Sequence, residues 1–172
     1  NLGDLIGHAT DEHGANMDKT ALIDLKDPEF PREYSFRDID AAANAVARGL
    51  VKRGFQRGDR IAILSANRME FMTAYFGTMK AGLVSVPVNF KFPNDTIEFI
   101  LRDADIKFVF TDAQQAAKVP AGYEAVSFDD PDAFAAFCDP GPFDAVRPTP
   151  NEVAMFLYTS GSTGRPKGVP LT

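Results

Sequence analysis

The residues best suited to chemistry lie together in one stretch, YTSGSTGRPKGVP, at residues 158–170. Its glycines lack the Cβ that would keep the backbone away from an anion, and they reach positive φ cheaply, so successive N–H groups can converge on phosphate oxygens. Four hydroxyl groups supply further donors at short range: Thr159, Ser160, Ser162 and Thr163. Lys167 adds a mobile positive charge. This combination suits a polyphosphate.

The familiar phosphate loops do not account for this stretch. The P-loop pattern G-x-x-x-x-G-K-[ST] needs glycine where Pro166 stands and serine or threonine where Gly168 stands, and the dinucleotide pattern G-x-G-x-x-G fails at Thr163. Both also need a helix directly after the loop, whereas Pro166 disfavours helix at Arg165. We therefore expect a loop between two extended segments. A flexible tail would explain the glycine and serine content, but not the apolar strand before the loop or the placement of Lys167.

Composition and charge limit the kind of ligand. The chain has 172 residues, enough for one domain or part of a larger one, with 45% hydrophobic and 24% charged residues. Its net charge of −6 argues against a nucleic-acid surface, which needs clustered lysine and arginine. A small phosphorylated ligand bound by one loop stays compatible with this charge.

Few residues could hold a metal ion or form a disulfide. Cys138 is the only cysteine, which excludes an internal disulfide and a multi-thiolate metal site and fits a reducing, cytoplasmic setting. His8 and His13 are the only histidines; their spacing matches no helical zinc pair, and we interpret them as solvated or capping residues. No apolar run approaches the ~20 residues of a membrane span, and no signal peptide is recognisable.

Helical and extended patterns alternate along the chain. Helices are expected from Leu2 to about Gly14, from a cap at Ser35 to Gly54, from a cap at Asn67 to Gly82, over 93–103 and 112–118, and from a start at Asp129, Asp130 and Asp132. Strands are expected at 20–25, 60–65, 83–88, 106–111, 123–128 and 152–160, with 168–172 also extended. This alternation predicts an α/β fold with a mainly parallel sheet flanked by helices. Residues 138–150, rich in proline, are expected to form a linker.

The quoted stretch resembles the signature of the adenylate-forming enzymes, which include acyl-CoA and aryl-CoA synthetases, luciferases and peptide-synthetase adenylation domains. The resemblance extends over nearly the whole chain: EYSFRDI, GDRIAIL, MKAGLVSVPVN and TIEFILRDADIKFVFT are similar to segments of that family in the same order. It implies that residues 1–172 are an N-terminal portion of the family's large AMP-binding domain, with a strand, phosphate loop and strand at 152–172.

In that family a carboxylate attacks the α-phosphate of ATP, giving an acyl adenylate and pyrophosphate, and the thiol of coenzyme A then takes the acyl group and releases AMP. The resemblance implies ATP, Mg²⁺, coenzyme A and a carboxylic acid as ligands of the parent enzyme. The matching loop would hold the β- and γ-phosphates through Thr159, Ser160, Gly161, Ser162, Thr163, Gly164 and Lys167. Thr159 and Thr163 are both candidates to approach Mg²⁺.

The resemblance also implies a longer enzyme. The chain begins with Asn1 rather than methionine, and the family's adenine-binding segments, acidic metal ligand and late lysine would follow Thr172. We therefore name no catalytic residue and expect the chain to be inactive by itself. Isolated chains are expected to self-associate through the uncovered sheet, and residues 161–168 to be mobile without nucleotide.

Two positions bear on the branch of the family. Phe90 stands where many relatives have proline, and peptide-synthetase adenylation domains usually have aspartate near Asn89. This favours a CoA ligase over an adenylation domain. Two further classes stay open: a phosphate-binding module without catalysis, and an interaction module that pairs its incomplete sheet with a partner.

Overall fold

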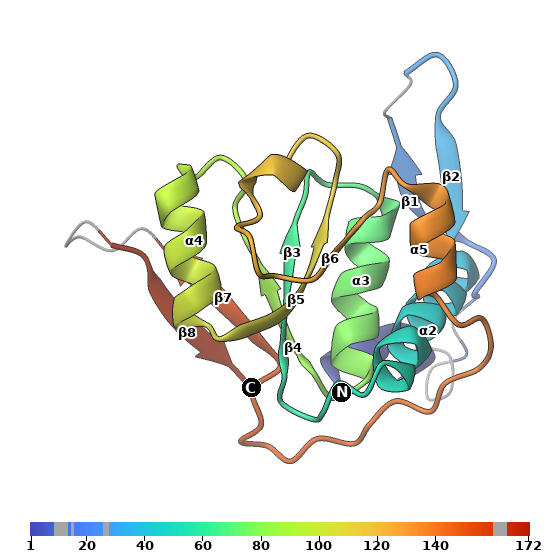
Figure 1. The fold of residues 1–172 in the computed structure, drawn as a ribbon. Coiled ribbons are helices and arrows are strands. Elements are labelled where there is room, and N and C mark those ends of the chain that lie inside the picture. Colours follow the sequence, from blue (N-terminus) through green and yellow to red (C-terminus); the bar gives the residue numbers. More distant parts are fainter. Residues whose placement is uncertain (9–13, 15, 26–27, 160–164) are drawn as a thin grey trace.

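The computed structural model describes residues 1–8, 14, 16–25, 28–159 and 165–172. It contains a six-stranded sheet of order β6-β5-β3-β4-β7-β8 and a separate two-stranded ribbon, β1-β2 (Figure 1). The strands of the large sheet are β3 (Arg60–Leu64), β4 (Val84–Pro87), β5 (Ile106–Thr111), β6 (Ala125–Ser127), β7 (Met155–Thr159) and β8 (Lys167–Leu171). The helices are α2 (Phe36–Lys52), α3 (Met69–Lys80), α4 (Asn94–Asp103) and α5 (Pro131–Phe137), with 3₁₀ turns η1 (Leu2–Asp4) and η2 (Ala116–Lys118).

The large sheet is parallel except at one edge. Strand β3 pairs in parallel with β4 and β5, β4 with β7, and β5 with β6, whereas β8 runs antiparallel to β7. A parallel pair needs a crossover connection, and α3 and α4 supply it after β3 and β4. The mainly parallel α/β fold expected from the sequence is confirmed.

Side-chain alternation along the strands divides the interior into two cores. Ile61 and Ile63 of β3 pack with α2, α3 and α5, whereas Ala62 and Leu64 pack on the other face with α4. All four side chains are fully buried. The central strand is therefore covered on both faces, as its continuous apolar sequence predicts.

Of the two expected helix caps, the one at Ser35 forms and the one at Asn67 does not; a further cap forms at Asp130, one of the acidic residues expected at the start of a helix. Ser35 and Asp38 make a capping box at the start of α2, and the Asp130 carboxylate accepts from the N–H of Ala133 at 3.0 Å at the start of α5. The cap expected at Asn67 is wrong, because α3 begins at Met69 and its N-cap is Arg68, which makes no side-chain cap. The Arg68 guanidinium instead binds the carboxylates of Glu70 and Asp129.

The helix expected over 112–118 is reduced to the single turn η2. Asp112 is buried, and its carboxylate accepts from the backbone N–H groups of Gln115 at 2.8 Å and Ala66 at 2.9 Å. The bond to the N–H three residues ahead is the one that Asp130 makes at the start of α5, but after Asp112 only turns follow before η2. The aspartate that was expected to begin a helix therefore links this turn to the end of β3.

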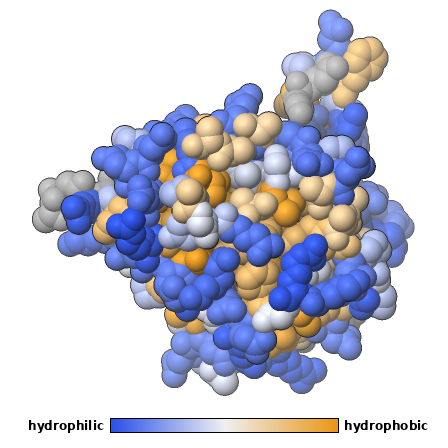
Figure 2. Space-filling view, in the orientation of Figure 1, coloured by the Kyte–Doolittle hydropathy of each residue, from blue (hydrophilic) through white to orange (hydrophobic). Residues whose placement is uncertain are grey.

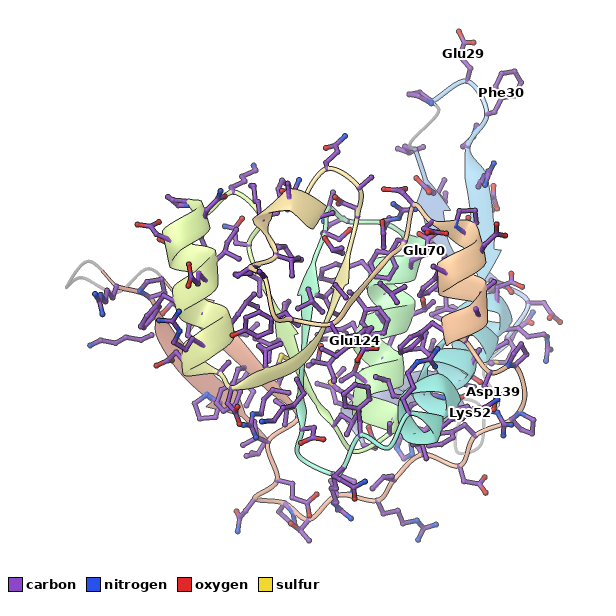
Figure 3. The ribbon with its side chains drawn as sticks, in the orientation of Figure 1. Glu29, Phe30, Lys52, Glu70, Glu124 and Asp139 are labelled. Carbon is purple, nitrogen blue, oxygen red and sulfur yellow. The ribbon has the colours of Figure 1, made fainter. Side chains whose placement is uncertain are left out.

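The ribbon of β1 (Thr20–Asp24) and β2 (Arg32–Ser35) is antiparallel and projects from the body of the molecule (Figure 1). Phe30, at its tip beside Glu29, points away from the body (Figure 3) and is 73% exposed. Hydrophobic residues also reach the surface in the middle of the face shown in Figure 2, within a border of hydrophilic ones. The two-stranded ribbon of β1 and β2 leads directly into α2, and its side chains contribute little to the two cores.

Residues 138–150 contain no helix or strand and run from α5 past α2 and α3 to β7. Arg48 of α2 holds the start of this segment through the Asp139 carboxylate at 2.8 Å, and Lys52 lies 3.6 Å from the same carboxylate (Figure 3). Further on, the N–H of Val146 donates to the carbonyl of Lys80 at the end of α3, at 2.8 Å. These contacts fix the point at which the chain re-enters the sheet as β7.

Helices α2 and α3 approach so closely that one glycine is required between them. A Cβ on Gly77 would lie 2.6 Å from the carbonyl oxygen of Ala43 and 2.8 Å from Cβ of Val46. We expect Gly77→Ala to lower the free energy of unfolding by about 1–3 kcal/mol, as overpacking does, despite the better helix propensity of alanine. Thermal or denaturant unfolding of the protein that carries this chain measures the change.

The matched control is Ala41→Gly, which exchanges the same two residue types at an exposed position of α2. There glycine should be the less stable residue, by roughly 0.5–1 kcal/mol. If alanine is favoured at both positions, α2 and α3 are not packed as closely as the structure describes.

Candidate phosphate-binding site

The predicted phosphate loop is carried by a hairpin of β7 and β8. The two strands pair from Met155 with Leu171 up to Thr159 with Lys167. These last two residues are the predicted phosphate contacts that the structure describes. The others lie outside the described residues: Ser160, Gly161, Ser162, Thr163 and Gly164.

The pairing places Thr159 and Lys167 beside each other. Directly opposite residues of an antiparallel pair project to the same face, with Cβ atoms about 4.5–5.5 Å apart. Both residues are exposed, and Leu157 and Val169, the opposite pair two positions back along the strands, share this face. The two side chains therefore leave the hairpin on the same face, next to the predicted phosphate loop.

The other face of the hairpin packs against α4. Phe156 and Tyr158 join the core that α4 forms with β3 and β4. The Tyr158 hydroxyl donates to the Asp103 carboxylate, at the last residue of α4, at 2.7 Å. A Cβ on Gly168 would lie 3.0 Å from Cζ of Tyr158, so glycine leaves room for the ring to cross the hairpin. Burial raises the pKa of Tyr158 above its usual value, and the Asp103 carboxylate raises that pKa further.

Arg165, on the far side of the loop, also turns to α4. Its guanidinium lies 5.4 Å from the centroid of the Phe99 ring, within the range of a cation–π contact. The two residues border a hollow of ≈ 450 Å³ lined by Asp95, Thr96, Glu98, Phe99, Arg102, Arg165 and Pro166. Arg165 and Lys167 thus have different surroundings although they stand two residues apart.

The sequence alone did not single out Tyr158, Arg165, Phe99 or Asp103. One signal was available: Phe99 and Asp103 are four residues apart in an expected helix, so they share one of its faces. What that face would contact could not be read from the sequence, because the hairpin lies far along the chain from α4.

A larger hollow, of ≈ 590 Å³, lies at the amino ends of β3 and β4 and reaches Tyr158 and Gly168. Its two arginines are already paired: Arg57 with Glu152 at 2.5 Å, and Arg60 with Asp105. Because carboxylates already neutralise both arginines, we do not assign a phosphate site to this hollow.

Neither a metal cluster nor a membrane span appears in the described part of the chain. Its residues include no group of three or more histidine, cysteine, aspartate or glutamate side chains able to hold a metal ion. Within the same residues, no helix has the length and apolarity that crossing a bilayer requires. His8 is exposed, and His13 lies outside the described residues.

The loop, its flanking strands and the parallel sheet together match a known family model, that of the AMP-binding enzymes, over residues 10–172. The chain belongs to this family. Curated relatives are peptide synthetases: coprinoferrin synthetase of Coprinopsis cinerea is 34% identical over 153 residues, 87% of the chain, and tyrocidine synthase 2 of Brevibacillus parabrevis is 36% identical over 140 residues, 81% of the chain. The chain spans only 6% and 4% of these two proteins.

Similar solved structures include CoA ligases. The chain is covered completely by the N-terminal domain of FACL13 from Mycobacterium tuberculosis, with a TM-score of 0.82 and 26% identity. An anthranilate CoA ligase in complex with anthranoyl-AMP matches 99% of the chain with a TM-score of 0.83 and 25% identity. The matched parts are 44% and 33% of those chains, so the family members are longer than this sequence.

The Tyr158–Asp103 hydrogen bond makes stability depend on pH in the alkaline range. A tyrosine whose pKa is raised by folding stabilises the fold fully below its ordinary pKa of about 10, and this contribution is lost as the pH rises above that value. We expect the wild type to be about 0.5–1.5 kcal/mol more stable than Tyr158→Phe at pH 9, and the difference to shrink between pH 10 and 12. Denaturant unfolding at each pH measures it.

Tyr123→Phe is the control. Tyr123 packs against the same core, but within the described residues it is Tyr158, and not Tyr123, whose hydroxyl bonds to Asp103. If the difference in unfolding free energy between the wild type and Tyr158→Phe stays constant across this pH range, the role assigned to the hydrogen bond is wrong.

Proposed function

We propose that residues 1–172 are an N-terminal part of the large domain of an AMP-forming ligase, and that the loop at 159–167 binds the phosphates of ATP. The observation that carries this is the pairing of Thr159 with Lys167 at the mouth of a glycine-rich loop. Membership of the AMP-binding enzymes supports it. The adenine site, metal ligands and catalytic groups would come from other parts of the parent protein.

The reaction proposed is the activation of a carboxylic acid. A carboxylate oxygen attacks the α-phosphorus of ATP, the bond from that phosphorus to the bridging oxygen of the β-phosphate breaks, and pyrophosphate leaves with the negative charge. Lys167 would balance charge on the β- and γ-phosphates, and the loop's N–H and hydroxyl groups would donate to their oxygens. Mg²⁺ would arrive bound to ATP as its counter-ion.

Among the loop residues, we propose that Thr159 donates its hydroxyl to the same phosphate as Lys167; their directly opposite positions in the hairpin support this. Ser160, Gly161, Ser162, Thr163 and Gly164 complete the proposed set of phosphate contacts. Transfer of this kind relies on positioning and charge neutralisation, so these residues would act on substrate binding and on the charge of the transition state.

For the second step we propose coenzyme A as the acceptor, as in the structurally similar anthranilate CoA ligase. The alternative is an adenylation domain, which the higher identity of the two peptide synthetases favours. Asn89 does not separate them on structural grounds. Its side-chain oxygen accepts from the N–H of Lys91 at 3.0 Å, a bond that aspartate could make equally well.

The setting proposed is cytoplasmic. Cys138 is a free, half-buried cysteine, and burial raises the pKa of its thiol to about 11. Its thiol is therefore protonated and unreactive near neutral pH. The half-buried thiol supports a structural role for the residue, and a single cysteine without a disulfide partner fits a reducing compartment.

Lys167→Ala should weaken the handling of ATP by the parent protein by about 1.5–3 kcal/mol, because a charge-assisted hydrogen bond to phosphate is lost. The rate of ATP–pyrophosphate exchange at limiting ATP measures this loss. Lys167→Arg should retain part of the activity, since it keeps the charge.

Lys107→Ala provides the control: it removes a lysine from β5 that is paired with Asp105 at 2.8 Å, away from the hairpin. Equal exchange rates for Lys167→Ala and the control would exclude Lys167 from phosphate binding.

The parent protein, incubated with ATP and a panel of carboxylic acids, should form AMP and pyrophosphate. With coenzyme A present, mass spectrometry should detect the acyl-CoA. Release of ADP in place of AMP would reject the proposed reaction. Acyl adenylate that is transferred only to a phosphopantetheine-loaded carrier protein would establish the alternative, and nucleotide binding without turnover would indicate a non-catalytic module.

A further inference from the structure

We propose that α4 holds both ends of the phosphate loop, and that Arg165 is a positioning residue which stacks on Phe99 rather than a phosphate ligand. This inference rests on the proposed function of the loop. It assigns a role to a basic residue of the loop that charge alone would assign to phosphate binding.

The two attachments lie on either side of the segment 160–164. Before it, the Tyr158 hydroxyl binds the Asp103 carboxylate at 2.7 Å. After it, the Arg165 guanidinium lies 5.4 Å from the centroid of the Phe99 ring. Phe99 and Asp103 are one turn apart on α4, a rise of about 6 Å. The two ends of the loop are therefore held against one stripe of a single helix, as the neighbouring positions of the hairpin and α4 in Figure 1 indicate.

The surroundings of Arg165 argue against a direct contact with phosphate. The hollow that it borders is also lined by Asp95, Glu98 and Arg102, and the last two pair at 2.6 Å, so Asp95 offsets the charge of Arg165 and the hollow offers no excess positive charge to an anion. Lys167 instead projects to the open face of the hairpin, beside Thr159. The chain bends at Arg165, and Pro166, half-buried in the same hollow, restricts the backbone there. The bend directs the two basic side chains to different sides.

Attachment of both ends would lower the cost of ordering the loop around ATP. Glycine-rich backbone loses more conformational entropy on ordering than other sequences, and fixed ends leave fewer conformations to lose. Loss of either partner of the Phe99–Arg165 contact should therefore weaken ATP binding without changing the chemical step. Because the contact needs both partners, the two losses should not add.

The test uses the parent protein with Phe99→Leu, Arg165→Ala and the double variant. Each single variant should raise the KM for ATP in pyrophosphate exchange about two- to fivefold, the range expected for one exposed cation–π contact, with kcat unchanged. The double variant should resemble the singles. Arg102→Ala is the matched control, since Arg102 lines the same hollow but pairs with Glu98 at 2.6 Å on α4; its KM should equal that of the wild type.

A second measurement does not depend on activity. Hydrogen exchange of the backbone amides of residues 165, 167–169 and 171 in the ATP-free protein should be faster in Phe99→Leu than in the wild type and in Arg102→Ala. If this difference appears while the wild type shows no pyrophosphate exchange, the attachment is correct and the proposed function is wrong.

Two results would overturn the positioning role. A raised KM in Arg165→Ala with a wild-type KM in Phe99→Leu would mean that Arg165 contacts phosphate directly. Unchanged hydrogen exchange in Phe99→Leu would mean that the contact does not hold the end of the loop.

Discussion

Burial of strand β3 on both faces is the constraint on which the rest of the structure depends. Its side chains alternate between a core shared with α2, α3 and α5 and a core shared with α4. Parallel strands need helical crossovers, and the two crossovers from β3 to β4 and from β4 to β5 deliver helices to opposite faces. Helix α4 is consequently the only long helix on its face within the described residues, and it borders the place where β7 and β8 join the sheet.

The same two-residue alternation organises the hairpin that carries the loop. One face gives Phe156 and Tyr158 to the core under α4, and the opposite face presents Thr159 and Lys167. A strand can serve packing and binding together because its successive side chains point in opposite directions. The apolar face fixes the register, since a slip of one residue would exchange the buried and exposed sets. The position of Lys167 beside Thr159 is thus a consequence of packing on the other side of the hairpin.

The exposed face of the hairpin also bears on association. Leu157, Val169 and Leu171 are 38–41% exposed, and β8 forms an edge of the sheet. Pro170 stands in this edge strand and has no N–H to donate to a further strand. The expected self-association through the sheet stays a prediction, and the proline makes the apolar face the more suitable surface for it than the strand edge.

The sequence by itself determined the parallel α/β sheet, the cap at Ser35, the two extended segments around the loop and, through its motifs, the family. These follow from local signals: side-chain periodicity, capping residues, and glycine and proline at fixed positions. The tertiary structure alone decided that Asp112 forms a turn in place of a helix, that Thr159 faces Lys167, and that Tyr158 and Arg165 attach the hairpin to α4. Asp103 stands 55 residues before its partner Tyr158. Contacts between such distant segments depend on how complete elements pack together, and no local pattern encodes that packing.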